Sequence, residues 1–336
     1  MPRIVRSLPC SAALCCVLLL LCEVVAVAQA PVTGICDFSA EGYLMSSSQT
    51  GLTRWSWPAL KSMPALKSTE SIAGREVAIG FPANDLLPSP SGKLLAVAGG
   101  EPAESGTALV LDWPSGVKRV RLTGHLDVIT ALHWLDDQRL VTVAMDQQVK
   151  VWDISAGQTL ATFDGHAKGV TDVCGIGKTR LIATSGLDQG IRIWDLDSSA
   201  LVRSLSLHTG AVNALVAKPS GQDLSSGQGL PMIASGSDDG TVRFWQPTIG
   251  RMVRFAKLPA PVLDLVWSTV NDTVIASCND GYLYWIDPLT VTIKDRQKVS
   301  DGWPYALAIV NDGNWIVVEG RQGDLVRIPV GGHDEQ

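Results

Sequence analysis

The chain has 336 residues, a formal net charge of −6, 46% hydrophobic residues and 18% charged residues. This composition supplies enough apolar side chains for a buried core and excludes an intrinsically disordered chain. The negative charge provides no basic field for nucleic acid or an anionic membrane, so neither is expected as a partner. Tryptophan is unusually frequent, with 11 residues against 4 Tyr and 5 Phe.

The first 28 residues have the features of a secretory signal peptide. A basic start at Arg3 and Arg6 precedes an apolar stretch over 12–22 and a small-residue exit, Ala-Val-Ala, at 26–28. The alternative is an uncleaved anchor, but Glu23 interrupts the apolar run short of the roughly 20 residues that span a bilayer. We therefore expect cleavage after position 28, no membrane insertion afterwards, and an exported protein, either periplasmic or secreted.

Three cysteines remain after removal of the signal: Cys36, Cys174 and Cys278. They are widely spaced and odd in number, which is not the pattern of a disulfide framework. No Cys-x-x-Cys pair, metal-ligand spacing of histidines or phosphate-binding glycine loop occurs in residues 29–336. No metal and no cofactor is therefore expected.

Three stretches in the middle of the chain repeat one pattern: LTGH to DQQVKVWDISAG, FDGH to LDQGIRIWDLDSS, and LHTG to SDDGTVRFWQPTIG. Their tryptophans are Trp152, Trp194 and Trp245, and a period of about 40 to 50 residues is typical of a propeller or solenoid. Within a unit, ALHWL, RLVTVAM and VKVWDI alternate or run apolar over short lengths between turn residues, as strands do. The chain after the signal is thus predicted to be all-β, built of four-stranded blades.

The turn before the third strand of each unit recurs seven times along the chain. The aligned positions are Gly51, Gly106, Gln147, Gln189, Gly240, Gly281 and Gly323. Two spacings are longer than the others, and the Ser- and Pro-containing stretches at 58–75 and 219–231 account for them as surface loops. We expect a single seven-bladed propeller over residues 29–336, closed into a ring that leaves no exposed sheet edge. Six complete blades with an irregular seventh remain an alternative.

These repeats resemble the WD-repeat β-propeller family, whose units begin near Gly-His and end in Trp-Asp. Two units match fully, at Gly124-His125 with Trp152-Asp153 and at Gly165-His166 with Trp194-Asp195, and a third, with His208 and Trp245-Gln246, matches with substitutions. The outer units have lost the motif; Ser56, Leu111, Ile286 and Ile328 take the place of its Trp. The resemblance implies a propeller whose N-terminal strand commonly completes the last blade.

A histidine, a hydroxyl and an aspartate in one repeat suggest a nucleophilic triad. The same set recurs in three units, each with a Trp six residues after the Asp: His125, Thr142, Asp146 and Trp152; His166, Thr184, Asp188 and Trp194; His208, Ser235, Asp239 and Trp245. An enzyme needs one active site, whereas a scaffold needs the same bonds in every blade. The resemblance likewise implies a structural hydrogen-bond network, so no catalytic residue is predicted.

The residue before each turn Asp, or before its equivalent, differs from unit to unit, although the surrounding framework repeats. The resemblance implies that this position lies on a rim that binds partners. Together with two residues that follow the Gly-His dipeptides, the candidate rim comprises Gln49, Glu104, Leu126, Met145, Lys168, Leu187, Asp238, Asn279 and Arg321. Apolar Met145 and Leu187 lie in neighbouring units, which favours a protein-binding platform on a monomeric propeller. The simpler alternative is that these side chains pack under neighbouring loops.

Two other functions remain open. An exported propeller enzyme, such as a quinoprotein dehydrogenase or a polysaccharide lyase or hydrolase, would place its site at the channel mouth. Its candidates would be Glu104, Asp127, Lys168, Asp238, Asp239 and Arg321, a mixed set without a recognisable acid/base pair. The chain could also be a non-haem companion in an exported electron-transfer or surface complex. A non-catalytic exported scaffold accounts best for the repeats.

Overall fold

The computed structural model describes residues 32–60, 71–72, 75–76, 79–219, 230–311, 313–319 and 325–332. The predicted signal peptide at 1–28 lies outside these residues. In the described part the fold is all-β, and its one helical element is a single 3-10 turn, η1 (Ser39–Glu41). None of the described residues belongs to a helix long and apolar enough to cross a membrane.

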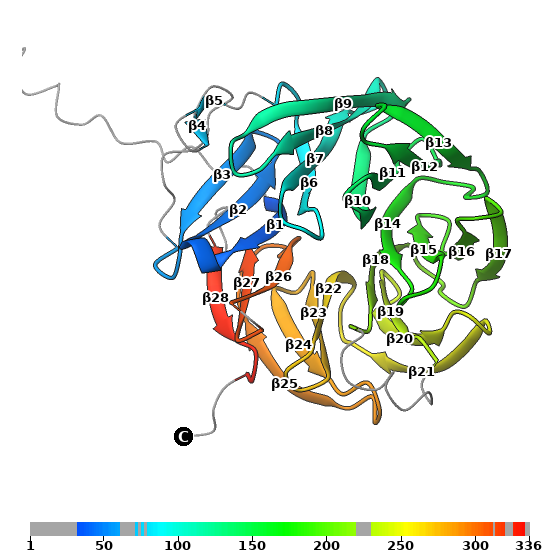
Figure 1. The fold of residues 1–336 in the computed structure, drawn as a ribbon. Helices are drawn as coiled ribbons and strands as arrows, with labels where there is room; N and C mark the ends of the chain where they lie inside the picture. The colour runs from blue at the N-terminus through cyan, green and yellow to red at the C-terminus, as the bar shows by residue number, and fades with distance from the viewer. Residues whose placement is uncertain are drawn as a thin grey trace, which may run out of the picture.

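Seven sheets stand around a central axis as the blades of a ring (Figure 1). Blade 1 consists of β1 (Val32–Phe38), β2 (Tyr43–Ser48) and β3 (Gly51–Ser56). A small hairpin, β4 (Ser71–Ile72) and β5 (Arg75–Glu76), follows it. Blade 2 consists of β6 (Ala83–Pro88), β7 (Leu94–Glu101), β8 (Ser105–Asp112) and β9 (Val117–His125).

Blades 3, 4 and 5 carry the three clear repeats. Blade 3 consists of β10 (Ile129–Asp136), β11 (Arg139–Ala144), β12 (Val149–Asp153) and β13 (Gln158–Phe163). Blade 4 consists of β14 (Val170–Gly175), β15 (Leu181–Gly186), β16 (Ile191–Asp195) and β17 (Ala200–Leu205). Blade 5 consists of β18 (Val212–Ala217), β19 (Ile233–Ser237), β20 (Thr241–Gln246) and β21 (Arg251–Lys257).

The last two blades complete the ring. Blade 6 consists of β22 (Val262–Ser268), β23 (Thr273–Cys278), β24 (Tyr282–Ile286) and β25 (Ile293–Lys298). Blade 7 consists of β26 (Leu307–Val310), β27 (Trp315–Glu319) and β28 (Leu325–Pro329). The prediction of an all-β, seven-bladed propeller is confirmed. Blades 1 and 7 each show three strands among the described residues.

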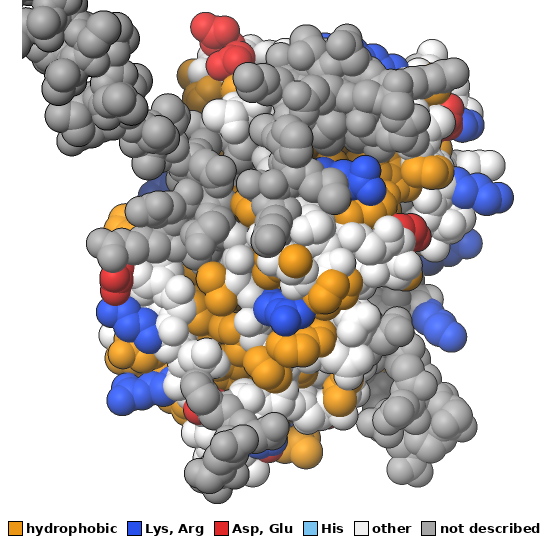
Figure 2. All heavy atoms as spheres, turned by 90° about the vertical axis from the view of Figure 1, so that its left-hand side faces the viewer, with side chains coloured by type: hydrophobic (Ala, Val, Ile, Leu, Met, Phe, Trp, Pro, Cys, Tyr) orange, Lys and Arg blue, Asp and Glu red, His pale blue; other side chains and the backbone are white. Residues whose placement is uncertain are grey.

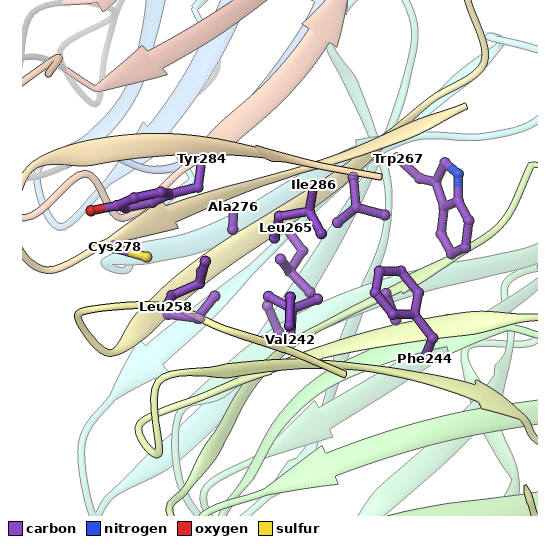
Figure 3. Close-up of a cluster of buried hydrophobic side chains, with 14 of the residues drawn as sticks. Val242, Phe244, Leu258, Leu265, Trp267, Ala276, Cys278, Tyr284 and Ile286 are labelled. Carbon is purple, nitrogen blue, oxygen red and sulfur yellow. The ribbon is translucent and has the colours of Figure 1, made fainter. Parts of the chain in front are cut away.

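Apolar side chains between neighbouring sheets hold the blades together. Figure 3 shows one such layer between blades 5 and 6, where Val242 and Phe244 of β20 meet Trp267 of β22 and Ile286 of β24. The Phe244 and Trp267 rings contact edge to face, with centroids 5.9 Å apart. Similar layers lie between the other blades, and burying them is the main free-energy gain of folding.

The ring closes where the innermost strands β1 and β26 lie side by side (Figure 1). Glu319, at the end of β27, is buried and accepts hydrogen bonds from the backbone N–H of Val32 at 3.1 Å and of Tyr305 at 3.4 Å. Farther along the seam, Asp37 accepts the Asn311 N–H at 3.1 Å. In the described part, packing of the two end blades therefore closes the ring, instead of an N-terminal strand paired to the last blade.

The outer side of this seam is partly apolar. Trp57 and Trp315 contact edge to face across it, and the Arg327 guanidinium lies over both rings, at 5.9 and 4.9 Å from their centroids. Figure 2 shows this side of the ring, with Lys and Arg side chains scattered over an apolar surface. Cation–π contacts thus reinforce the joint between the first and last blades.

Candidate functional site

A buried polar network links three side chains of blade 3 to His125, the last residue of β9 in blade 2. The His125 Nδ1 lies 2.9 Å from Asp146 Oδ2, and its Nε2 lies 2.7 Å from Thr142 Oγ1. The Trp152 indole donates its N–H to the same hydroxyl at 2.8 Å. Asp146 also accepts the Leu126 N–H at 2.9 Å, so the network anchors the loop that follows the histidine.

The same network recurs in blades 4 and 5. His166 bonds to Asp188 at 3.0 Å and to Thr184 at 2.8 Å, and Trp194 donates to that hydroxyl at 2.8 Å. In blade 5 the corresponding partners are His208, Asp239, Ser235 and Trp245, with all three bonds at 2.8 Å. All twelve residues named from the repeats thus lie in three equivalent sets.

The protonation of these groups fits a structural network. Burial lowers the pKa of His166 and His208, so each imidazole is neutral near pH 7 and keeps one N–H for its carboxylate. Although burial alone would raise the pKa of Asp239, hydrogen bonds from Thr241 and His208 outweigh it and lower the pKa to about 2. The hydroxyls of Thr142, Thr184 and Ser235 are fully buried, so no substrate can reach them. They are not available as nucleophiles.

The candidate rim residues can be compared through a repeated backbone bond. The residue after each second strand donates its N–H to the loop before the first strand of its blade; the pairs are Met145 to Val128, Leu187 to Gly169, Asp238 to Ala211, and Asn279 to Pro261. In each pair the donor nitrogen lies 2.9 to 3.0 Å from the carbonyl oxygen. We call this side of the ring, which carries the histidine loops and these turns, the His-loop face.

The same bond locates the equivalent position in two further blades. In blade 2 the donor is Gly100, because β7 and β8 continue to a longer hairpin that places Glu104 beyond the equivalent position. In blade 7 the donor is Glu319, while Arg321 lies outside the described residues. Glu319 is buried in the closure of the ring, so this position is not part of an exposed rim there. Gln49 follows Ser48 on an exposed turn.

Blades 3 and 4 both bring apolar side chains to the His-loop face. Met145 packs so closely on Gly169 that any side chain there would collide with its sulfur, and the Gly169 carbonyl in turn accepts the Leu187 N–H. Met145 is therefore half-buried, whereas Leu187 is 36% exposed and Leu126 is 74% exposed. Lys168 is exposed beside Gly169. These four side chains, Leu126, Met145, Lys168 and Leu187, form what we call the blade 3/4 patch.

Sequence reasoning missed an exposed aromatic pair on the same face. Trp303 and Tyr305 precede β26, contact edge to face with centroids 6.0 Å apart, and are 56% and 41% exposed. Leu207, which replaces the glycine of the Gly-His dipeptide in blade 5, is half exposed as well. The outer blades lack Gly-His, so no motif pointed to the aromatic pair.

Two of the enzyme candidates, Asp127 and Asp238, are loop residues that accept hydrogen bonds. Asp127 accepts the backbone N–H groups of Ala103 and Val128, each at 2.7 Å, and Asp238 accepts the Asn213 side-chain amide at 2.8 Å. These bonds give both carboxylates a role in holding loops. Over the described ranges, no group of three His, Cys, Asp or Glu is arranged to hold a metal ion.

Three half-buried carboxylates on the innermost strands were also missed. Asp85, Asp172 and Asp264 lie in alternate blades, each just after a register shift of its strand. Each accepts a backbone N–H from the next blade, at Leu132, Leu215 and Leu307, over 2.6 to 2.8 Å. They therefore tie blade 2 to 3, blade 4 to 5 and blade 6 to 7. Periodicity gave no signal for them, because a strand residue at a bulge need not follow alternation.

Burial shifts the ionisation of these carboxylates. It raises the pKa of Asp85 to about 7 and of Asp264 to about 6, and it raises the pKa of Asp172 well above its usual range. The backbone N–H groups that each carboxylate accepts oppose this shift without cancelling it.

Comparison with known proteins agrees with the geometry. Residues 116–153, 157–195 and 199–246 match the family "WD domain, G-beta repeat". The chain is similar to "Telomerase protein component 1" of Rattus norvegicus, with 26% identity over 320 residues, 89% of this chain and 11% of the relative. It is also similar to "Guanine nucleotide-binding protein subunit beta" of Oryza sativa subsp. indica, with 25% identity over 57% of this chain and 54% of the relative.

Solved structures share the fold. The chain resembles "Structure of U3-55K" with a TM-score of 0.75 and 16% identity, covering 90% of this chain and 96% of that one. It resembles a chain of "Crystal Structure of Mitotic Checkpoint Complex" with a TM-score of 0.73 and 19% identity, covering 86% and 84%. Three repeats of the chain thus match the WD40 model, and the chain is similar to WD-repeat β-propellers. It spans only part of the curated relatives' length.

Asp85→Asn is expected to weaken the pH dependence of stability. Between about pH 4, where the unfolded carboxyl titrates, and about pH 7, the folded protein binds more protons, so this group makes stability fall as pH rises. The free energy of unfolding is measured with urea at pH 5 and at pH 8. Its decrease between these pH values should be smaller in the variant than in the parent, by on the order of 2 kcal/mol. The exposed Asp164→Asn serves as the control. Equal pH dependence in the parent and Asp85→Asn would contradict the assignment.

Proposed function

We propose that this protein is an exported, non-catalytic WD-repeat scaffold that binds a protein partner on its His-loop face. The observation that carries the proposal is the blade 3/4 patch. Leu126 and Leu187 present apolar side chains to solvent, Met145 joins them through Gly169, and exposed Lys168 supplies a polar border. Apolar centres with polar borders are typical of protein interfaces.

The blade 3/4 patch stands on a rigid support. The Asp146 and Asp188 carboxylates of two buried networks bond to the backbone N–H of Leu126 and of Ala167, at 2.9 and 2.8 Å. Loops held in this way lose little conformational entropy when a partner binds. The patch is therefore preorganised for recognition.

The relatives favour a role inside an assembly. Their printed names describe a telomerase component and a G-protein subunit, and one similar solved structure is a checkpoint complex. WD-repeat relatives in protein complexes support protein partners for this chain. A fold that presents many loops from a fixed ring is suited to such a role, although fold alone does not determine function.

The platform is tested by affinity capture from the exported fraction of the source cells with two matched variants. Leu126→Asp with Leu187→Asp should abolish recovery of the main co-purifying protein, because buried carboxylates at an interface are costly. Leu160→Asp with Leu201→Asp changes two leucines of the outer strands, 56% and 45% exposed, and should leave capture intact. Circular dichroism checks that both variants fold. If the parent and both variants recover the same partners, the blade 3/4 patch is not the binding site.

The export part of the proposal rests on the residues at 1–28. The N-terminus of the protein purified from its native source is read by mass spectrometry. The mature chain is expected to begin at Gln29 and to be recovered outside the cytoplasm. Recovery from the cytoplasm with residues 1–28 intact would contradict export.

A further inference from the structure

A pocket of about 450 Å³ opens on the opposite face of the ring, between blades 1 and 2. Its walls come from the turn η1 between β1 and β2, the loop between β6 and β7, and the start of the connection after β8. Three aromatic residues and three prolines line it: Phe38, Tyr43, Trp113, Pro88, Pro90 and Pro114. This volume is in the range of sites that bind small molecules or short peptide segments.

The aromatic wall is rigid. Phe38 stacks with Tyr43 and with Trp113, with ring centroids 5.1 and 5.0 Å apart, and all three side chains are largely buried. The Arg54 guanidinium lies 4.1 Å from the Tyr43 ring centroid, outside the pocket lining. The Tyr43 ring thus already packs against one guanidinium next to the pocket, a contact that cation–π attraction favours.

The pocket has a negative charge of its own. Its lining includes the carboxylates of Asp37 and Glu41 and no Lys, Arg or His. Asp37 accepts backbone N–H groups from Ser39 at 2.8 Å and from Asn311 at 3.1 Å, so it is held in place by the fold. Glu41 is exposed, and no described residue pairs with its side chain. It is therefore free to meet a cation that enters.

We propose that this pocket binds the arginine side chain of a basic peptide segment. A guanidinium can stack on aromatic and proline surfaces while its N–H groups bond to a carboxylate, and no other standard side chain combines both contacts as well. Burial of a neutral apolar ligand would leave Glu41 and Asp37 without a counter-ion. The site lies on the face opposite the blade 3/4 patch, so it is independent of the proposed function.

The test uses a pair of peptides that differ only in charge, acetyl-Gly-Arg-Gly amide and its neutral citrulline analogue. The protein is labelled with 5-fluorotryptophan, and the Trp113 resonance is assigned from Trp113→Phe. The arginine peptide should shift this resonance saturably, and the citrulline peptide should not. Glu41→Gln should weaken binding about two- to fivefold, the usual range for one exposed ion pair, and added salt should weaken it further.

Glu104→Gln, on the His-loop face, is the matched control and should leave the affinity unchanged. Because Glu41 is exposed, Glu41→Gln is not expected to disturb folding, which circular dichroism verifies. The proposal is overturned by the absence of a saturable shift with the arginine peptide, by an equal response to citrulline, or by unchanged affinity in Glu41→Gln. None of these outcomes bears on the proposed partner binding by the blade 3/4 patch.

Discussion

One buried hydroxyl in each of blades 3, 4 and 5 joins an imidazole to an indole, and the geometry of the His-loop face depends on it. In blade 4 the Thr184 hydroxyl accepts the Trp194 N–H and meets the His166 ring, whose other nitrogen faces Asp188. Asp188 also accepts the backbone N–H of Ala167 and so fixes the loop that follows His166. Every group has a partner, and a fully satisfied buried network stiffens the sheet that carries it.

The end blades reach the same fold with other bonds. In blade 1 Trp55 donates to Ser46 at 2.9 Å, and strand register places this pair where Trp152 and Thr142 lie in blade 3. In blade 6 the Trp285 indole instead donates to the Val330 carbonyl of blade 7 at 2.8 Å. Loss of the repeated motif in these blades is thus compensated by one bond within blade 1 and by one bond between blades 6 and 7.

The sequence predicted the middle of the ring well, because each repeat carries its own Gly-His, turn and Trp. Prediction failed where turn lengths change. Blade 1 has a shorter turn, so Trp55 and not Ser56 takes the tryptophan position, and the longer β7–β8 hairpin displaced Glu104. Asp85 and Glu319 could not be found from periodicity, since the Leu132 N–H that Asp85 accepts comes from the next blade, and Val32 meets Glu319 only where the ring closes.

The central claim is that these networks are architecture, and the unfolding free energy of Thr184→Val tests it most directly. Valine keeps the shape but removes the hydroxyl, which leaves the Trp194 indole N–H and the His166 Nε2 without their partner, so the free energy of unfolding should fall by about 2 kcal/mol or more. Thr159→Val, on the exposed outer strand β13, should change stability by less than about 0.5 kcal/mol. Equal stability of Thr184→Val and the parent would contradict the account.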